Sequence, residues 1–150
     1  MADEPLDLAR AILAQGRDLA IATLRPDGFP QATTVSYVAD GLTIYFGCGE
    51  HSQKARNIAR DARVSLTLTL DYDDWTGIRG LSLAGLAERV TDPAEVGHIG
   101  KLMMARFPQV ADLDPPWEGD IAFIRVMPKV ISVLDYRKGF GHTDLVALPG

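Results

Sequence analysis

Ser52 and Lys54 are the side chains whose types and spacing point most clearly to chemistry. Ser52 follows the glycine-broken stretch Gly47-Cys48-Gly49 and is a good N-cap for a helix that begins at Gln53. Lys54 lies in the first turn of that helix, where a cation opposes the helix dipole unless an anion is bound beside it. Because the free N–H groups of a helix start bind phosphate, Ser52-Gln53-Lys54 predicts a phosphate site.

The segments on either side of this motif predict the elements that hold it. Leu42 to Phe46 alternates apolar and polar residues with the period of a β-strand, and Val64 to Leu70 does the same. Between them, a helix is expected from Gln53 to about Asp61. A structural alternative stays open, since a serine before a helix is usually only a cap and Lys54 and Arg56 could be solvated surface charges.

The rest of the chain predicts more strands than helices. Gly85, inside a long strand, marks a bulge or a close backbone approach. We expect a mainly β protein with helices (α+β), built as a small six-stranded antiparallel barrel in one domain over residues 1–150. The other strand regions are Asp18 to Leu24, Gln31 to Val38, Arg79 to Val90, and a last region broken at Met127-Pro128 into Asp120 to Val126 and Lys129 to Asp135.

The overall composition excludes several functional classes. A net charge of -5 argues against a general nucleic-acid surface, which needs a basic face. The acidic start, Met1-Ala2-Asp3-Glu4-Pro5, is unlike a secretory signal, and no apolar run is long enough to cross a membrane. We therefore expect a cytoplasmic protein without nucleic-acid or membrane partners.

The residue types that most often carry catalysis or bind metals form no motif in this sequence. The histidines, His51, His98 and His142, have no spacing that would place a metal between them. The single cysteine, Cys48, excludes an internal disulfide and lies in a glycine-flanked loop. The sequence predicts no metal site and leaves the catalytic residues unknown, so a bound cofactor would have to supply any redox chemistry.

A family resemblance rests on the order strand, Ser-x-Lys, short helix and strand. It is carried by Ile44 to Gly47, Ser52-Gln53-Lys54, Asn57 and Asp61 to Leu66, which together resemble the FMN-binding split β-barrel proteins of the pyridoxamine 5'-phosphate oxidase type. The likeness covers about Leu6 to Val146 in the order of elements. It implies an antiparallel split barrel of the flavin-reductase type, assembled as a homodimer with FMN at the interface and a small-molecule substrate over the flavin ring.

The resemblance also implies which residues contact the cofactor. Ser52 and Lys54 would hold the FMN phosphate with Gln53 close by, and Arg79 would approach from the second subunit. The classical oxidases carry a glutamine where this chain has Gly80. The strand that flanks the flavin ring would contribute Gln31, Thr33, Thr34, Val35 and Ser36, although threonines are also simply good strand formers.

The C-terminal region offers candidate substrate-binding groups. In the true vitamin B6 oxidase of the family, a C-terminal stretch rich in arginine with a histidine binds the pyridoxal phosphate, and here Arg137, Lys138 and His142 stand in that region. Gly139 and Gly141 break the family's order, so vitamin B6 oxidation is not the expected activity. A merely polar terminus is the alternative.

The expected function is that of an FMN-binding flavoprotein, an oxidoreductase that acts on a small substrate through hydride transfer at the flavin N5. Three alternatives remain: a reductase that uses the deazaflavin F420 on the same fold, a haem-binding or haem-degrading relative, and a non-enzymatic flavin-binding stress protein. Substrate, electron donor and physiological role do not follow from the sequence.

Overall fold

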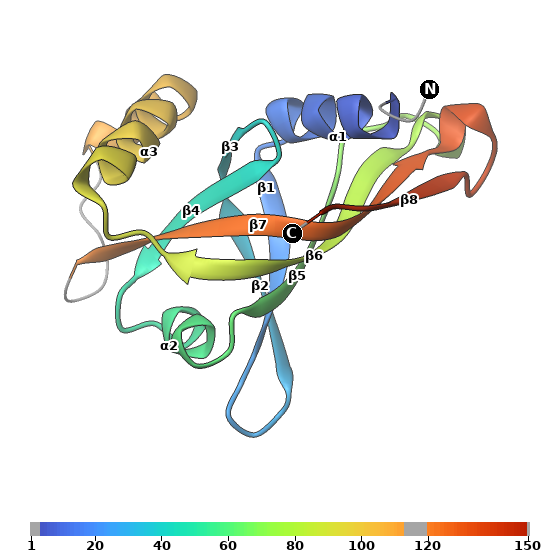
Figure 1. Cartoon of the computed structure of the whole chain (residues 1–150). Coiled ribbons are helices and arrows are strands. Elements are labelled where there is room, and N and C mark those ends of the chain that lie inside the picture. Colours follow the sequence, from blue (N-terminus) through green and yellow to red (C-terminus); the bar gives the residue numbers. More distant parts are fainter. Residues whose placement is uncertain (1–3, 113–119, 150) are drawn as a thin grey trace.

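The structure is a computed structural model that describes residues 4–112 and 120–149 (Figure 1). Its strands are β1 (Asp18–Leu24), β2 (Pro30–Ser36), β3 (Val38–Asp40), β4 (Thr43–Gly49), β5 (Arg63–Thr69), β6 (Arg79–Arg89), β7 (Ile121–Asp135) and β8 (Thr143–Ala147). Its α-helices are α1 (Glu4–Gln15), α2 (Gln53–Arg60) and α3 (Pro93–Arg106), and its short 3-10 helices are η1 (Trp75–Gly77), η2 (Pro108–Asp112) and η3 (Tyr136–Lys138).

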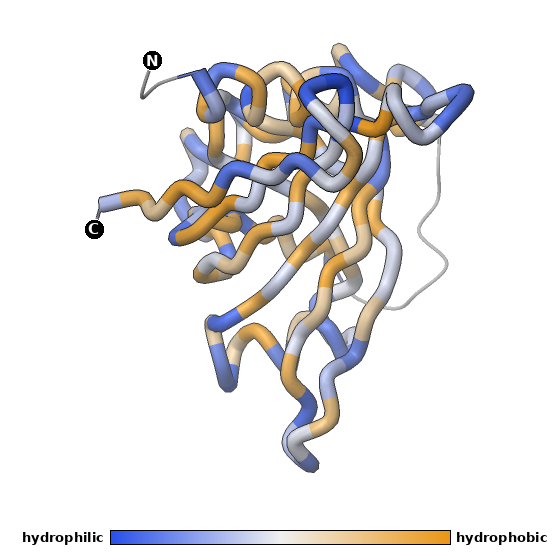
Figure 2. The backbone as a smooth tube through the Cα atoms, turned by 90° about the vertical axis from the view of Figure 1, so that its right-hand side faces the viewer, coloured by the Kyte–Doolittle hydropathy of each residue, from blue (hydrophilic) through white to orange (hydrophobic). Residues whose placement is uncertain are grey.

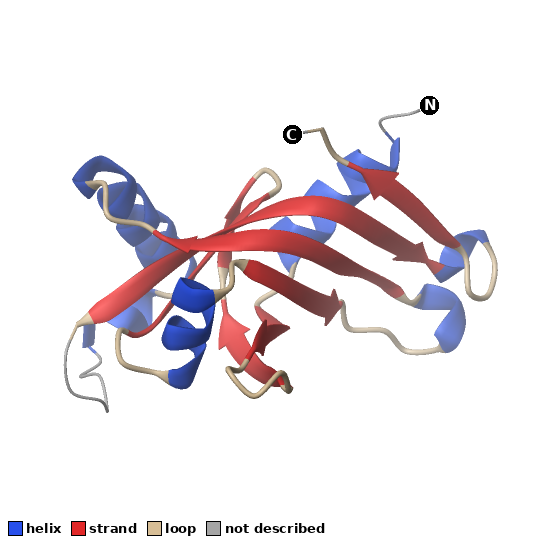
Figure 3. Cartoon of the chain, turned by 60° about the horizontal axis from the view of Figure 1, so that its bottom comes forward, coloured by secondary structure: helices blue, strands red, loops and turns tan. Residues whose placement is uncertain are grey.

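The described strands form one curled antiparallel sheet in the order β2-β1-β5-β6-β7-β4-β3, with β8 paired to β7 (Figure 3). β2 is a free edge of this sheet, but the curl brings it beside β4, with no ladder between the two strands. A half-closed barrel with such a seam is a split barrel. The predicted fold class is therefore confirmed. The described sheet has eight strands rather than the six expected, because β3 forms a separate short strand and β8 adds one from the C-terminal region.

The core fills the concave side of the sheet. β5 shows why, because its valine and leucines are buried while its serine and threonines are exposed, in strict alternation. Figure 2 shows hydrophobic and hydrophilic residues following one another along the chain in this way. α1 closes one end of the barrel with Ala9, Ile12 and Leu13. α3 covers a second, smaller core that includes Tyr45 and Ile99.

Four details differ from the sequence-based expectation. β4 continues through Gly47, Cys48 and Gly49, all paired with β7, so Cys48 lies in a strand and not in a glycine-flanked loop. Tyr37 interrupts the predicted strand Gln31 to Val38, because its buried hydroxyl donates a 2.7 Å hydrogen bond to the Leu13 carbonyl of α1. β7 runs through Met127-Pro128 without a break, and the irregularity falls on its partner strand at Ala84/Gly85. The prolines between Pro108 and Gly119 predict an extended connector, but this segment begins as η2, and its Trp117 lies outside the described residues.

Gly80 and Gly85 are glycines because neighbouring backbone leaves no room for a side chain. A Cβ on Gly85 would lie 2.7 Å from the Met127 carbonyl oxygen, which confirms the expected close approach. A Cβ on Gly80 would lie 2.6 Å from the Leu68 carbonyl oxygen. The glutamine found at this point in the classical oxidases would therefore require the β5–β6 ladder to shift.

Gly80→Ala is expected to lower the free energy of unfolding by about 1–3 kcal/mol, the usual cost of overpacking. Urea denaturation would measure it. Gly97→Ala is the matched control, since Gly97 is exposed on α3 with nothing within 4 Å of an added Cβ. That variant should gain about 0.5–1 kcal/mol from helix propensity. Equal stabilisation by both changes would show that the β5–β6 contact is not close.

Candidate functional site

The start of α2 is built as the sequence predicts. Ser52 has extended backbone dihedrals, and its hydroxyl accepts a 3.2 Å hydrogen bond from the Ala55 N–H. The helix carries Lys54, Arg56 and Arg60 and no acidic residue. Nothing in α2 itself therefore offsets the positive end of its dipole, which favours an anion at this point.

Lys54 is the residue on which the site depends. Its side chain is half-buried, and Nζ lies 5.9 Å from the ring centroid of Phe46, a fully buried residue of β4. Within the described residues, its ammonium makes no ion pair or hydrogen bond. Burial lowers the pKa of Lys54, as expected for a cation that has lost water without gaining a counter-ion. An anionic group would relieve that cost.

Cys48 of β4 lies beside Ser52 and Lys54. Burial raises the pKa of its thiol, and the Ser52 hydroxyl and the Lys54 charge offset this only in part. The thiol is therefore neutral at ordinary pH, and a neutral thiol is a poor nucleophile. Cys48 therefore lines the site as an uncharged side chain and has no role as a nucleophile.

A buried amide network joins α2 to the first two strands. Asn57 is 1% exposed, and its Nδ2 donates to Thr23 Oγ1 of β1 at 3.0 Å and to Gln31 Oε1 of β2 at 3.3 Å. Its Oδ1 accepts a 2.7 Å hydrogen bond from Gln53 Nε2. Two predicted cofactor residues, Gln31 and Gln53, are thus brought together through Asn57.

The predicted flavin strand divides its candidates between its two faces. Gln31, Thr33 and Val35 face the concave side, where Thr33 is paired with the buried Ile21. Thr33 Oγ1 is buried and has no hydrogen-bond partner within the described part of the chain. A buried hydroxyl without a partner costs stability, so a ligand group in the seam would satisfy it.

Thr34 and Ser36 lie on the opposite, exposed face of β2. The Ser36 hydroxyl donates to Asp18 Oδ1 at 2.6 Å, so that group already has a partner. The two faces of β2 could touch one cofactor only if it lay along the unpaired edge of the strand, where backbone groups are also free.

Arg79 lies at the end of β6 far from α2. α2 follows β4 and lies beside the other end of β6, around Arg89, whereas Arg79 is paired with Asp135 across the β6–β7 ladder. Its side chain has no ion pair or hydrogen bond with any described residue. Within one chain, Arg79 does not reach Lys54. The contribution of Arg79 from a second subunit stays a prediction.

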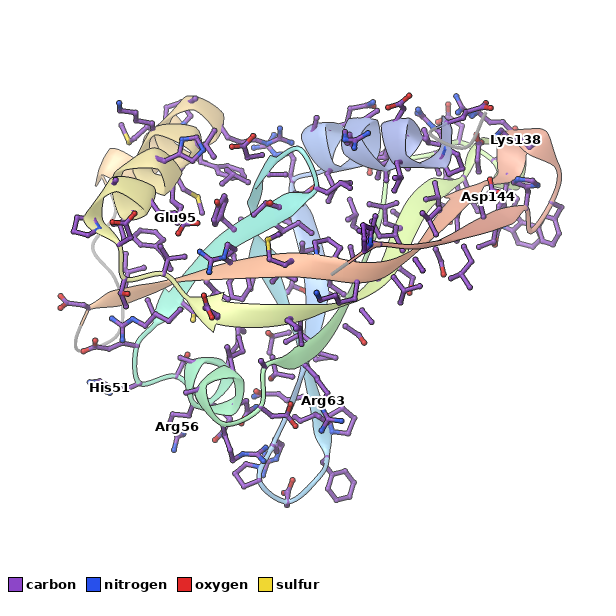
Figure 4. The ribbon with its side chains drawn as sticks, viewed as in Figure 1. His51, Arg56, Arg63, Glu95, Lys138 and Asp144 are labelled. Atoms are coloured by element: carbon purple, nitrogen blue, oxygen red, sulfur yellow. The ribbon has the colours of Figure 1, made fainter. Side chains whose placement is uncertain are left out.

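The three candidate substrate residues share the end that holds Arg79. Figure 4 shows Lys138 at this end and Arg56 at the other. Each of the three already has an acidic partner. Arg137 Nε binds Asp135 at 2.8 Å, Lys138 Nζ lies 3.5 Å from a carboxylate oxygen of Glu4, and His142 Nε2 lies 3.1 Å from Asp144 Oδ2.

Sequence reasoning missed Phe46, Thr23 and the central role of Asn57. Asn57 was part of the motif, but only the folded chain shows that it joins three elements. Thr23 could have been noticed as a hydroxyl residue inside a strand of buried character. In the described part of the chain, no three His, Cys, Asp or Glu residues gather as metal ligands, and no helix is long and apolar enough to span a membrane.

The family is established by comparison with known proteins. The sequence profile described as "Pyridoxamine 5'-phosphate oxidase" matches residues 6–135, so the chain belongs to this family. No curated protein matches the sequence.

Solved structures share the fold but differ in described function. The heme binding protein from Mycobacterium smegmatis superposes with a TM-score of 0.81 at 22% identity, over 96% of this chain and 58% of that one. The conserved hypothetical protein Rv2991 from Mycobacterium tuberculosis gives 0.75 at 29% identity, over 95% and 90%. An F420 reductase gives 0.62 at 29% identity, over 82% and 94%. The chain thus spans little more than half of the heme binding protein.

Proposed function

We propose that the chain binds FMN, with its phosphate at the start of α2. The observation that carries this proposal is Lys54, a half-buried cation without an acidic partner in the described residues, in the first turn of a helix that has no acid. Ser52 and Lys54 hold the phosphate with Gln53 beside them. The flavin ring lies along Gln31 to Ser36, where the buried hydroxyl of Thr33 needs a partner.

The proposed activity is that of an FMN-dependent oxidoreductase acting on a small molecule. Bound flavin would supply hydride transfer at N5. The residues of the chain supply the position of the cofactor and the electrostatics around it. Lys54 compensates the phosphate charge, the Asn57 network fixes α2 against β1 and β2, and the buried Phe46 keeps water from one side of the ammonium.

We also propose a homodimer, with the cofactor at the interface and Arg79 supplied by the second copy. The convex side of β1, β5 and β6 supports it, because the side chains at its centre are small and uncharged, so a second sheet can approach closely. We call this the small-residue face. It comprises Ala20, Ala22, Ser65, Thr67, Ser82 and Ala84, which are neighbours across the strand ladders.

F420 is the second candidate cofactor. A solved F420 reductase shares the fold over 82% of this chain, and a deazaflavin also carries a phosphate on its side chain. The same start of α2 would hold either phosphate. Haem is a third candidate, suggested by the name of the heme binding protein, although His142 and His98 are each hydrogen-bonded to an aspartate here.

The visible absorption spectrum of the purified protein tests these assignments. Flavin bands that persist through a desalting column after FMN is added are the expected result. Deazaflavin absorption or a Soret band would overturn the FMN assignment in favour of F420 or haem. FMN that binds without turnover with any nicotinamide donor would instead support a non-enzymatic flavin-binding protein.

FMN affinity is expected to fall at alkaline pH. Phosphate binds only the charged form of Lys54 and raises its pKa, so binding is favoured while the ammonium is protonated and is lost as pH rises through the lowered pKa of the free protein. The fall should therefore begin below the usual lysine pKa of about 10.4. Lys54→Arg stays charged throughout and is the control. Fluorescence titration at several pH values would measure it, and identical pH profiles would remove Lys54 from the site.

A further inference from the structure

A groove lies between α2 and the neighbouring ends of β6 and β7. Its volume is about 360 Å³, which lies within the range of small-molecule pockets. Figure 1 shows α2 beside this end of β6. We call this cavity the α2–β6 groove. The side chains that line it indicate what kind of ligand it could hold.

The walls of the groove are apolar and built largely from short side chains. Ile58 and Ile124 line its buried side. α2 and the turn after it contribute Ala59 and Ala62, which are exposed. Longer side chains at these two positions would occupy the space, so the alanines keep it open. The other lining alanines are Ala55, Ala87 and Ala122. An apolar ligand would cover this methyl surface favourably.

The uncompensated charge at the rim of the groove is positive. Glu50 is paired with Arg89 at 3.4 Å, and Glu88 is bound by Arg125. Arg56 has no acidic partner among the described residues, since its guanidinium binds only an amide oxygen of α2 at 3.0 Å. A ligand with an anionic group would therefore find a cation available at the rim, whereas the two glutamates would repel a second anionic group.

The groove is separate from the proposed phosphate site, although α2 borders both. Ala55 and Ala59 are four residues apart and lie on one side of the helix, because an α-helix has about 3.6 residues per turn. Asn57 lies on the opposite side, where it holds α2 to β1 and β2. Neither Ser52 nor Lys54 lines the groove. A molecule in the groove would therefore leave the start of α2 open to a phosphate.

From this lining we propose that the α2–β6 groove binds a small apolar molecule with a single anionic group, such as an aromatic carboxylate or sulfonate. The apolar body of the molecule covers the alanines. Its anionic group pairs with Arg56, whose planar guanidinium suits two oxygens of one group. Glu50 and Glu88 select against molecules with several anionic groups, such as nucleotides. The site does not require FMN, so it stands or fails separately from the proposed function.

The probe for this site is anilinonaphthalene sulfonate (ANS), which combines aromatic rings with one sulfonate. Phenylnaphthylamine has the same rings without the sulfonate and is the matched uncharged ligand. Fluorescence titration of the folded protein should show saturable ANS binding at one site per chain, and weaker binding of phenylnaphthylamine. Equilibrium dialysis should show that ANS stays bound when FMN is added at saturating concentration.

Two substitutions test the two parts of the site. Ala59→Leu fills the groove from an exposed position and should raise the dissociation constant of ANS at least roughly tenfold. Ala105→Leu, at an exposed position of α3, should leave that constant unchanged. Arg56→Gln removes the cation and should raise it roughly threefold to tenfold, without changing the affinity of phenylnaphthylamine. Lys101→Gln, which removes an exposed cation from α3, is the control for net charge.

Several results would overturn the proposal. Absence of saturable ANS binding would do so, and displacement of ANS by FMN would place the probe at the start of α2 instead. Equal ANS affinities in Ala59→Leu and Ala105→Leu, with unchanged unfolding temperatures, would show that the probe binds elsewhere. An equal effect of Arg56→Gln on both ligands would contradict the anion contact. Because Arg56→Gln leaves the alanine walls intact, it decides the question even where Ala59→Leu does not fold.

Discussion

Lys54→Ala is expected to weaken FMN binding by about 1–3 kcal/mol, which raises the dissociation constant roughly fivefold to 150-fold. The reason is local. Lys54 is a half-buried cation that makes no ion pair within the described residues, so a bound phosphate would gain a charge-assisted hydrogen bond while the desolvated ammonium gains a counter-ion. Isothermal titration calorimetry with FMN would measure the change.

The control for this experiment is Lys101→Ala. Lys101 is an exposed cation on α3, so its removal changes the net charge equally without touching α2. Its effect on FMN affinity should be small and should vanish as salt is added. An equal loss in the two variants would show that Lys54 acts through the general field of the protein rather than by contact with the phosphate.

Asn57→Ala is expected to lower the free energy of unfolding by about 2–3 kcal/mol, because it leaves a small cavity and deprives buried polar groups of a partner. Thr23 is 1% exposed, and its hydroxyl would lose its donor, as would the amide oxygen of Gln31. The amide nitrogen of Gln53 would lose its acceptor. For a chain of this length the melting temperature should fall by roughly 5–10 °C. Thermal and urea unfolding would both report it.

Arg56→Ala is the matched control for stability, since Arg56 is exposed one position earlier on α2 and binds only Gln53 in the described structure. It should change stability by less than about 0.5 kcal/mol. Asn57→Ala should also weaken FMN binding, because α2 and β2 would no longer be held in register. A stable Asn57→Ala variant with unchanged FMN affinity would contradict the role given to the network.

Much of the fold could be predicted because local patterns and tertiary packing agree. The alternation of Val64 to Leu70 matches the burial of β5, and Ser52 caps α2 as its residue type favours. Features that depend on distant partners could not be predicted. β7 stays continuous through Pro128 because β6 absorbs the irregularity at Gly85, and nothing near Pro128 in the sequence indicates this.

In the candidate site, too, the local features could be predicted and those that depend on distant residues could not. The motif Ser52-Gln53-Lys54 is local, so the sequence was sufficient to propose a phosphate site there. The buried surroundings of Lys54 depend on Phe46, which comes from another strand. Trp75 is 65% exposed, and this exposure depends on where its loop lies relative to the core, which the sequence around it does not indicate.

The most direct test of the account compares the affinities of FMN and riboflavin in parallel calorimetric titrations. The two ligands share the flavin ring and differ in the phosphate, so the difference isolates the site at Ser52 and Lys54. We predict that FMN binds at least roughly tenfold more tightly, and that Lys54→Ala removes most of this difference. Equal affinities for the two ligands, or a preference for FMN that survives in Lys54→Ala, would contradict the phosphate site.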